Sequence, residues 1–285
     1  MFASSASGRD PASLASNPFA ARVARLLPDW HDVSWVTETA STNADLQRAT
    51  RAALADWRGP LLRGADLQTA GRGRAGRPWR TQAGDALLFS CALNTRLPPA
   101  QLPPLSVVAG VAACEALNRF LPAAAQPVTV KWPNDLQWGS AKLAGILPET
   151  VSLPAGLRTA PHQIGLVLGI GVNLRGGAAL STHLGRAVAD WSMTGGRADP
   201  ADLVAAIAEA WRTAIDVYAA EGFAPFVARF ACHDALGGHT VRVLDGDRVL
   251  FEGIASGVDA TGRLQVSTSD GLRAVTVGDV SVRSA

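Results

Sequence analysis

The chain has 285 residues, of which 48% are hydrophobic and 18% are charged, a composition typical of a globular protein with room for one large domain and a smaller one. No apolar run approaches the ~20 residues that a membrane-spanning helix needs, which excludes a helical membrane protein. The net charge of +2 is too small to indicate wholesale binding of nucleic acid.

Residues 1–20 are rich in Ala, Ser and Pro and lack a continuous apolar segment behind a basic start. We therefore expect a disordered lead-in rather than a secretory signal. Cys91, Cys114 and Cys232 lie far apart and form no CxxC pair. This arrangement predicts buried, reduced thiols rather than disulfides or a zinc site, and we expect a cytoplasmic protein.

Ser41, Thr42 and Asn43 precede a helical pattern that continues to Trp57, so one of the three is expected to be the N-cap. A strand-like stretch at residues 61–67 then leads into a loop rich in glycine and arginine. Further on, we expect a buried strand at residues 86–93 and an apolar helix at residues 105–120, entered through Pro103-Pro104.

The loop at residues 69–79 places Arg72, Arg74 and Arg77 among three glycines, ahead of Trp79. Glycines let backbone N–H groups approach an anion, and guanidinium groups bind phosphate oxygens in bidentate fashion. The pattern is neither a Walker loop nor a dinucleotide fingerprint. Taken alone, it fits a phosphate site and a flexible basic surface loop equally well.

The strand expected at residues 128–131 ends in Lys131-Trp-Pro-Asn-Asp135. Asn134 and Asp135 carry oxygens suited to Mg²⁺ or to a general base, although an Asx turn after proline is an equally ordinary role. Lys142 begins an apolar strand at residues 143–147, which we expect Pro148 to interrupt.

Only two of the 26 basic residues are lysines, Lys131 and Lys142. A chain so biased toward arginine tolerates the guanidinium group at most of its basic positions. Lysine offers a compact point charge instead of a planar fork, so the pair marks either positions whose chemistry needs the amine or chance survivors.

A strand is expected at residues 164–170, and residues 158–161 look like an irregular insertion within the segment 152–162. Asp199-Pro200 predicts the start of an amphipathic helix that continues to Tyr218. After Gly237-Gly238 the pattern changes to alternation, with short strands that predict a small barrel packed against the main domain.

Together these segments resemble the biotin protein ligase family, from about Thr39 to the C-terminus. The matching pieces, in the family's order, are Ser41–Asn43, Gln68, GRGRAGRPW at 71–79, KWPNDL at 131–136, KLAGIL at 142–147, GIGVNL at 169–174 and VRSA at 282–285. The resemblance implies an α+β fold. It consists of a mixed sheet flanked by helices, the class II synthetase-like catalytic domain, over residues 21–236, followed by an SH3-like β-barrel at residues 237–285.

The resemblance also implies a reaction in two steps. Biotin and ATP give biotinyl-5′-AMP with the help of Mg²⁺, and biotin then passes to a lysine of a biotin carboxyl carrier protein. Lys142, Arg72 and Asp135 are implied as catalytic residues, with Asn134 and Asp135 as magnesium ligands and Trp79 or Trp132 as an apolar wall. Biotin-binding roles are implied for Ser41, Thr42, Asn43, Gln68, Gly71, Arg72, Gly73, Arg74, Lys142, Gly145 and Gly171. Nucleotide-binding roles are implied for Arg74, Arg77, Trp79, Asn134, Asn173 and Arg283.

Some family members carry an N-terminal DNA-binding domain, whereas about 38 residues precede the matching region here. We therefore expect a ligase that binds no specific DNA, and a sheet edge that could mediate a homodimer. Ala75 makes the loop less basic than in some relatives. The alternatives are a lipoate or octanoate ligase or transferase of the same fold, and a nucleic-acid binder, which would leave Lys142 unexplained.

Overall fold

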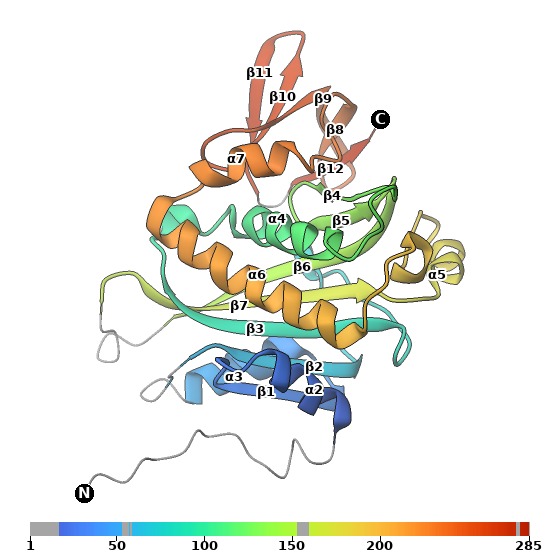
Figure 1. The fold of residues 1–285 in the computed structure, drawn as a ribbon. Coiled ribbons are helices and arrows are strands. Elements are labelled where there is room, and N and C mark those ends of the chain that lie inside the picture. The colour runs from blue at the N-terminus through green and yellow to red at the C-terminus, as the bar shows by residue number, and fades with distance from the viewer. Residues whose placement is uncertain (1–16, 53–56, 58, 153–159, 278–279, 285) are drawn as a thin grey trace, which may run out of the picture.

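The structure, a computed structural model, describes residues 17–52, 57, 59–152, 160–277 and 280–284. Its centre is a seven-stranded mixed sheet in the order β1-β2-β3-β7-β6-β5-β4 (Figure 1). The strands are β1 (Asp32–Thr39), β2 (Leu61–Gln68), β3 (Ala86–Arg96), β4 (Val128–Lys131), β5 (Asp135–Trp138), β6 (Ala141–Ser152) and β7 (Gln163–Asn173). The expected fold class, a mixed sheet flanked by helices, is confirmed.

β1 and β2 run parallel, and every other neighbouring pair in this sheet is antiparallel. The strands predicted at residues 61–67, 86–93, 128–131 and 164–170 are all present, three of them longer than predicted. β3 and β7 are buried along most of their length because both faces of the sheet are covered there. The sequence analysis did not identify β1 or β5.

The predicted interruption at Pro148 is wrong, because β6 continues through it to Ser152 and Pro148 pairs with Leu168 of β7. The backbone N–H of Ile146 points away from β7, toward the carbonyl oxygen of Asn134. Pro148 follows two residues later, so its nitrogen points to the same side. β5 pairs with β6 only as far as Gly145, so this side is open and proline costs the sheet no hydrogen bond.

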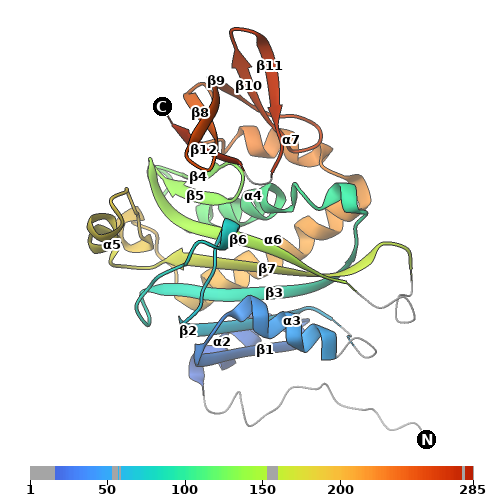
Figure 2. The same cartoon turned by 180° about the vertical axis from the view of Figure 1, so that it is seen from behind.

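Three helices cover one face of the sheet: α2 (Pro18–Leu26), α4 (Leu105–Asn118) and α6 (Pro200–Glu221). α3 (Thr42–Ala52) covers the other face, as the view from behind shows (Figure 2). Most of the core lies between the sheet and the first three helices, with Trp30, Trp211 and Phe89 fully buried. A smaller cluster under α3 includes Leu46 and Val167.

The predicted helix starts are confirmed where the structure describes them. Asp199 caps α6 by accepting from the N–H of Ala201 at 2.9 Å, and Pro200 occupies the first helical position. Ser41 caps α3, since its hydroxyl accepts from the N–H of Ala44 at 3.4 Å. Of the predicted lead-in, residues 1–16 lie outside the described residues, but α2 already begins at Pro18. α3 is described as far as Ala52, and Trp57, the predicted helix end, is described and is not helical. Residues 53–56 and the segment 153–159 also lie outside the described residues.

The C-terminal unit is a five-stranded antiparallel sheet in the order β11-β10-β9-β8-β12. Its strands are β8 (Thr240–Asp245), β9 (Arg248–Val258), β10 (Leu264–Thr268), β11 (Gly271–Val275) and β12 (Val280–Ser284). The predicted short strands are therefore present. In the part of the chain that the structure describes, β11 and β12 do not pair with each other, so the small barrel predicted here is seen as an antiparallel sheet that does not close.

The C-terminal sheet is joined to the main domain through α7 (Ala224–Ala231) and through the backbone of Val130 in β4. Val130 accepts from the N–H of Ala235 at 3.0 Å and donates to the carbonyl of His233 at 2.7 Å. The linker thus pairs with β4 directly before Lys131-Trp-Pro-Asn-Asp135.

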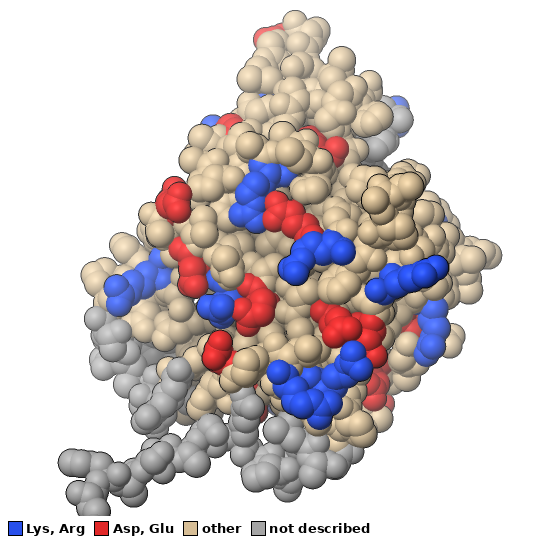
Figure 3. Space-filling model, in the orientation of Figure 1, with Lys and Arg blue, Asp and Glu red and all other residues tan. Residues whose placement is uncertain are grey.

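On the face that carries α4 and α6, residues of opposite charge stand next to one another (Figure 3). Arg229 pairs with Glu115 at 2.6 Å and Arg212 with Glu209 at 2.8 Å. This face therefore offers no continuous basic surface to a nucleic acid. Among the described residues, no helix combines the length and the hydropathy that crossing a membrane requires.

The prediction that the thiols are buried is confirmed for two of the three cysteines. Cys91 and Cys114 are buried, and Cys232, just beyond the end of α7, is exposed. None of them is in a disulfide.

Candidate active site

A cavity of about 530 Å³ lies on the α3 face of the main sheet. Its walls come from the start of α3, the end of β2, the loop at residues 71–79, the β4–β5 connection and the middle of β6 and β7. These segments are far apart in the sequence and meet over β6 and β7, which are neighbours in the sheet. Both strands carry glycines where they line the cavity.

The cavity is strongly cationic. Of the residues that the structure describes, six basic side chains and a single carboxylate, that of Asp135, line it. The basic residues are Arg72, Arg74, Arg77, Lys131, Lys142 and Arg186. Both lysines of the chain are therefore cavity residues, which favours the view that these positions need the amine.

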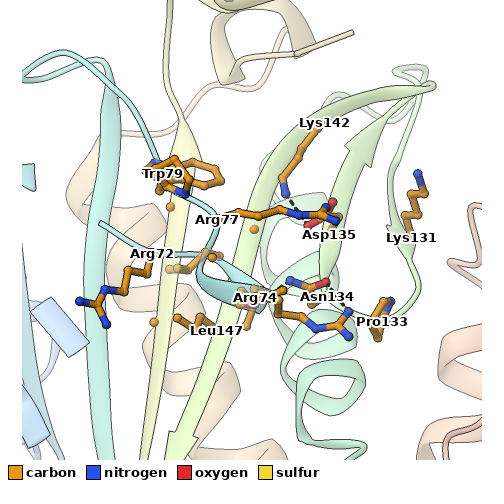
Figure 4. Close-up of a pocket in the computed structure, with 18 of the residues that line it drawn as sticks. Arg72, Arg74, Arg77, Trp79, Lys131, Pro133, Asn134, Asp135, Lys142 and Leu147 are labelled. Atoms are coloured by element: carbon orange, nitrogen blue, oxygen red, sulfur yellow. Dashed lines mark hydrogen bonds and ion pairs between the residues drawn. The ribbon is translucent and has the colours of Figure 1, made fainter. Parts of the chain in front are cut away.

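Lys142 and Asp135 form an ion pair, with Nζ and Oδ1 2.5 Å apart (Figure 4). The β5–β6 hairpin places them side by side, and their side chains are only 19% and 25% exposed. The Lys142 ammonium also lies 5.6 Å from the centre of the Trp79 ring. A cation held in this way can turn to an incoming anion without crossing the cavity.

The backbone of Lys142 is held in place by the segment at residues 187–189. Its N–H donates to Ala187 at 3.1 Å, and its carbonyl accepts from the N–H of Ala189 at 2.9 Å. The amide of Asn173 donates to the carbonyls of both Lys142 and Ala189, at 3.3 and 3.0 Å. Asn173 is buried and does not line the cavity, so here it positions the strand that carries Lys142 instead of facing the cavity.

The arginine loop folds as a small hairpin over the cavity. Gly73 donates to the carbonyl of Arg77 at 2.7 Å, and Trp79 donates to that of Gly71 at 2.9 Å. The tip needs two positive φ angles, 53° at Ala75 and 68° at Gly76. Alanine in this left-handed conformation costs on the order of 1 kcal/mol, so the tip is a strained point of the loop.

The three loop arginines face different directions (Figure 4). Arg74 reaches the opposite wall, where its guanidinium lies 3.4 Å from Oδ1 of Asn134. Arg77 extends toward the side of Lys142 and Asp135, whereas Arg72 points the other way. The loop therefore offers cations to both halves of the cavity.

Gly145 and Gly171 are paired across β6 and β7 and form a floor beneath Trp79. A Cβ at Gly171 would lie 2.6 Å from the Trp79 ring, and one at Gly145 would lie 3.1 Å from both that ring and Nζ of Lys142. Side chains here would fill the cavity, so the glycines are what keep it open.

The far end of the cavity is polar. Gln68 Oε1 accepts from the N–H of Thr42 at 2.8 Å, and the Thr42 hydroxyl lies 2.7 Å from that of Ser90. Asn43 continues the chain of hydrogen bonds to Glu149 of β6. Thr42, Asn43 and Ser90 are all buried, so this group is rigidly held.

Most residues singled out from the sequence meet at this cavity. Thr42, Asn43, Gln68, Arg72, Gly73, Arg74, Arg77, Trp79, Asn134, Asp135, Lys142, Gly145 and Gly171 line it, together with Trp132. Ser41, Gly71 and Asn173 do not line it, and the side chain of Arg283 lies outside what the structure describes.

The sequence analysis missed Arg186 and Ser90. Arg186 follows α5 (Gly177–Leu184), a helix that was not predicted, and reaches the cavity because Val188 bridges to Lys142. Ser90 carries the one hydroxyl in the apolar run at residues 86–93. That contrast was the one available signal.

Asn134 and Asp135 fit Mg²⁺ only as a minor part of its coordination shell. Asn134 is already engaged, with Oδ1 facing Arg74 and Nδ2 donating to Ile146 at 2.9 Å. No group of three or more His, Cys, Asp or Glu residues suited to a metal occurs in the described parts of the chain. A single carboxylate suits a Mg²⁺ ion that is held mainly by phosphates and water.

Family models match both units of the chain. That of the Biotin/lipoate A/B protein ligase family matches residues 37–171, and that of the Biotin protein ligase C terminal domain matches residues 236–283. Among solved structures, the biotin protein ligase from Aquifex aeolicus in complex with biotin and ATP is similar with a TM-score of 0.70 and 25% identity, covering 88% of this chain and 98% of that one.

Two curated proteins are similar to this chain in amino-acid sequence. The bifunctional ligase/repressor BirA of Escherichia coli (strain K12) is 32% identical over 221 residues, which are 78% of this chain and 66% of that protein. The chain thus spans just under two thirds of that relative's length. The biotin--[acetyl-CoA-carboxylase] ligase of Paracoccus denitrificans is 32% identical over 224 residues, 75% of this chain and 86% of that protein.

Proposed function

Since the chain belongs to the biotin protein ligase family, we propose that it activates biotin with ATP and transfers it to a lysine of a biotin carboxyl carrier protein. One observation carries the proposal. A single cavity combines six cationic side chains with a rigid polar end, so it suits a ligand that is anionic at one end and polar but uncharged at the other.

In the first step, a carboxylate oxygen of biotin attacks the α-phosphorus of ATP, and the bond from that phosphorus to the bridging oxygen breaks. The products are biotinyl-5′-AMP and pyrophosphate. Two anions must meet, so their repulsion has to be offset by fixed cations. Lys142 is placed to hold the carboxylate against the phosphate, with Arg74 and Arg77 over the adenylate.

In the second step, the acceptor lysine attacks the carbonyl carbon of the mixed anhydride and AMP leaves. The attacking amine must be neutral, because a protonated amine has no free electron pair. Asp135 is our candidate for orienting that amine and accepting its proton, since it is the one carboxylate among the described residues that line the cavity. The arginine hairpin excludes water from the anhydride meanwhile.

Mg²⁺ would enter with ATP, held by phosphate oxygens and by Asp135, with Asn134 beside it. When bound, the ion would neutralise part of the phosphate charge. Biotin at the polar end, with its ring near Thr42 and Gln68, would place its carboxylate toward Lys142.

The test is pyrophosphate release by the purified protein with ATP, Mg²⁺ and either biotin or lipoate, followed by mass spectrometry of an added carrier domain. We expect release with biotin and a carrier heavier by one biotinyl group. Release with lipoate alone would identify the lipoate ligase instead. No release with either acid would contradict both activities.

A further inference from the structure

We propose that Arg186 binds the two terminal phosphates of ATP and the pyrophosphate formed from them, and that Ser181 and Asp190 hold Arg186 at the cavity wall as positioning residues. The inference rests on the proposed function and deepens it, since it assigns the leaving group of the first step to a residue outside the arginine loop. Residues 177–190, which contain α5 and Arg186, are called the α5 loop below.

The α5 loop rejoins the main sheet at the backbone of Lys142. Val188 forms a parallel bridge with Lys142, and the N–H of Lys142 donates to the carbonyl of Ala187 at 3.1 Å. Arg186 directly precedes this contact and lines the cavity, although the residue as a whole is exposed. Among the described residues, none forms a hydrogen bond or an ion pair with its guanidinium group. The group is therefore available to an anionic ligand.

Two side chains close the α5 loop. The buried carboxylate of Asp190 accepts from the N–H of Gly177 at 2.7 Å and so joins the two ends of the loop. The Ser181 hydroxyl accepts from the N–H of Val188 at 2.9 Å and donates to the carbonyl of Gly177 at 2.8 Å. A Cβ at Gly177 would lie 3.0 Å from both the Asp190 carboxylate and the Val188 carbonyl oxygen, so a side chain there would crowd both. The segment that carries Arg186 is thus held in place by the protein itself.

The order of contacts along β6 gives the direction in which a ligand lies. At the polar end of the cavity, Asn43 donates to the carbonyl of Leu147 at 3.2 Å. The Lys142 side chain folds back over Gly145, where a Cβ would lie 3.1 Å from Nζ (Figure 4). Leu147 and Lys142 are five residues apart, about 17 Å in an extended strand. Since the α5 loop joins at the backbone of Lys142, it and the polar end lie on opposite sides of the ammonium group.

The geometry of phosphoryl displacement makes this order informative. The attacking and the leaving oxygen stand on opposite sides of the α-phosphorus. Biotin enters from the polar end with its carboxylate at Lys142, so the pyrophosphate has to leave toward the α5 loop. The bridging oxygen keeps the electron pair of the broken bond, and negative charge therefore grows on the leaving group. A guanidinium group, which binds two phosphate oxygens at once, stabilises that charge.

The alternative ligand for Arg186 is the α-phosphate, which stays with the adenylate. Biotinyl-5′-AMP retains this phosphate and has lost the pyrophosphate. The two assignments therefore differ in which half of the reaction needs Arg186.

The first test compares Arg186→Gln with the wild type in both halves. Biotin-dependent exchange of labelled pyrophosphate into ATP follows the first step, and transfer from purified biotinyl-5′-AMP to a carrier domain follows the second. We expect KM for pyrophosphate to rise on the order of tenfold in Arg186→Gln, with KM for biotinyl-5′-AMP unchanged. Arg175→Gln is the matched control, because Arg175 is also exposed, lies just before the α5 loop and pairs with Asp85 outside the cavity.

Two results of this comparison would overturn the proposal. One is an equal KM for pyrophosphate in Arg186→Gln and Arg175→Gln. The other is a raised KM for biotinyl-5′-AMP in Arg186→Gln, which would assign the guanidinium group to the α-phosphate.

Ser181→Ala tests the positioning role. It should raise KM for pyrophosphate and leave KM for biotin unchanged. Added to Arg186→Gln it should have no further effect, because nothing is left for Ser181 to position. Thr182→Ala is the control, since the Thr182 hydroxyl bonds within α5, to the carbonyl of Ala178 at 3.3 Å. Additive effects of Ser181→Ala and Arg186→Gln would contradict the positioning role.

The last test does not depend on turnover. Calorimetry measures the binding of inorganic tripolyphosphate in the presence of Mg²⁺ and without biotin. The wild type and Arg175→Gln should bind equally, and Arg186→Gln about tenfold more weakly. Equal affinity in all three proteins, or no binding by the wild type, would overturn the assignment of Arg186. Tripolyphosphate binding by a wild type that exchanges no pyrophosphate with biotin present would contradict the proposed function instead.

Discussion

The indole Nε1 of Trp132 donates a hydrogen bond to the backbone carbonyl oxygen of Gly262, 3.1 Å away, and so ties a cavity residue to the C-terminal sheet. Gly262 sits in the β9–β10 turn with φ of +78°, and a Cβ there would lie 2.6 Å from Pro104. Trp132 directly precedes Pro133, Asn134 and Asp135. The C-terminal sheet therefore helps to hold the wall of the cavity that carries the carboxylate.

Trp132→Phe should lower the free energy of unfolding by about 1–2 kcal/mol more than Trp191→Phe, as measured by urea denaturation. Both indoles are buried, but the Nε1 of Trp191 has no partner within the described chain. The control therefore removes the same volume without breaking a hydrogen bond. Equal losses in the two variants would show that the Gly262 contact contributes nothing.

Asp259 organises the same turn and gives it a pH dependence. Partial burial raises its pKa, but hydrogen bonds from the hydroxyl and N–H of Thr261 and from Arg263 outweigh this and hold the pKa below its usual value of 3.8. The stabilisation is thus present above about pH 4 and is lost as the pH falls through the lowered pKa.

Asp259→Asn should accordingly lose less stability than the wild type between pH 7 and pH 3, in thermal melts at several pH values. Asp270→Asn, the same charge change in the β10–β11 turn, is the control. If Asp259→Asn loses as much stability between pH 7 and pH 3 as the wild type, the Asp259 carboxylate does not cause the loss of stability in acid.

Lys142→Met keeps the length of the side chain and removes its charge. Adenylate formation should fall on the order of a hundredfold or more in kcat, because the fixed cation acts between two anions. Pyrophosphate release under single turnover measures this step. A rise in KM for Lys142→Met with kcat unchanged would assign Lys142 to binding only.

Substitutions in the arginine loop should release the activated intermediate. Both Arg72→Gly and Arg74→Gly are expected to label bystander amines, but Arg74→Gly more strongly, because Arg74 contacts Asn134 on the opposite wall. Biotinylation of an added unrelated protein, followed on a blot, gives the ranking. A stronger effect of Arg72→Gly would show that Arg72, which points away from Lys142 and Asp135, closes the site.

Thiol labelling should distinguish the three cysteines. Burial raises the pKa of Cys91, and burial together with Glu115 raises that of Cys114 to about 12, so neither forms the reactive thiolate at neutral pH. Cys232 is exposed. A maleimide should add once to the native protein, at Cys232, and three times after denaturation. Native labelling of Cys114 would contradict its burial.

Local patterns predicted much of the fold. The caps at Ser41 and Asp199 and the apolar runs of β3, β4 and β7 depend on neighbours in the sequence, which is why they could be recognised. β5 was missed because its four residues carry no distinct pattern. The interruption expected at Pro148 was wrong because the effect of proline depends on whether its nitrogen faces a partner strand, which is a property of the sheet.

For the site, the sequence by itself determined the set of chemical groups: two lysines, an arginine loop, glycines on two strands and a lone Asn-Asp pair. Only the tertiary structure decided what each group does. It joined Lys142 to Asp135, divided the loop arginines between two directions, withdrew Asn173 from the cavity and linked Asn43 to Ser90 and Glu149. The physical reason is that a motif lists donors and acceptors, whereas the direction of a hydrogen bond depends on partners such as Ser90 and Leu147, which no local pattern brings together.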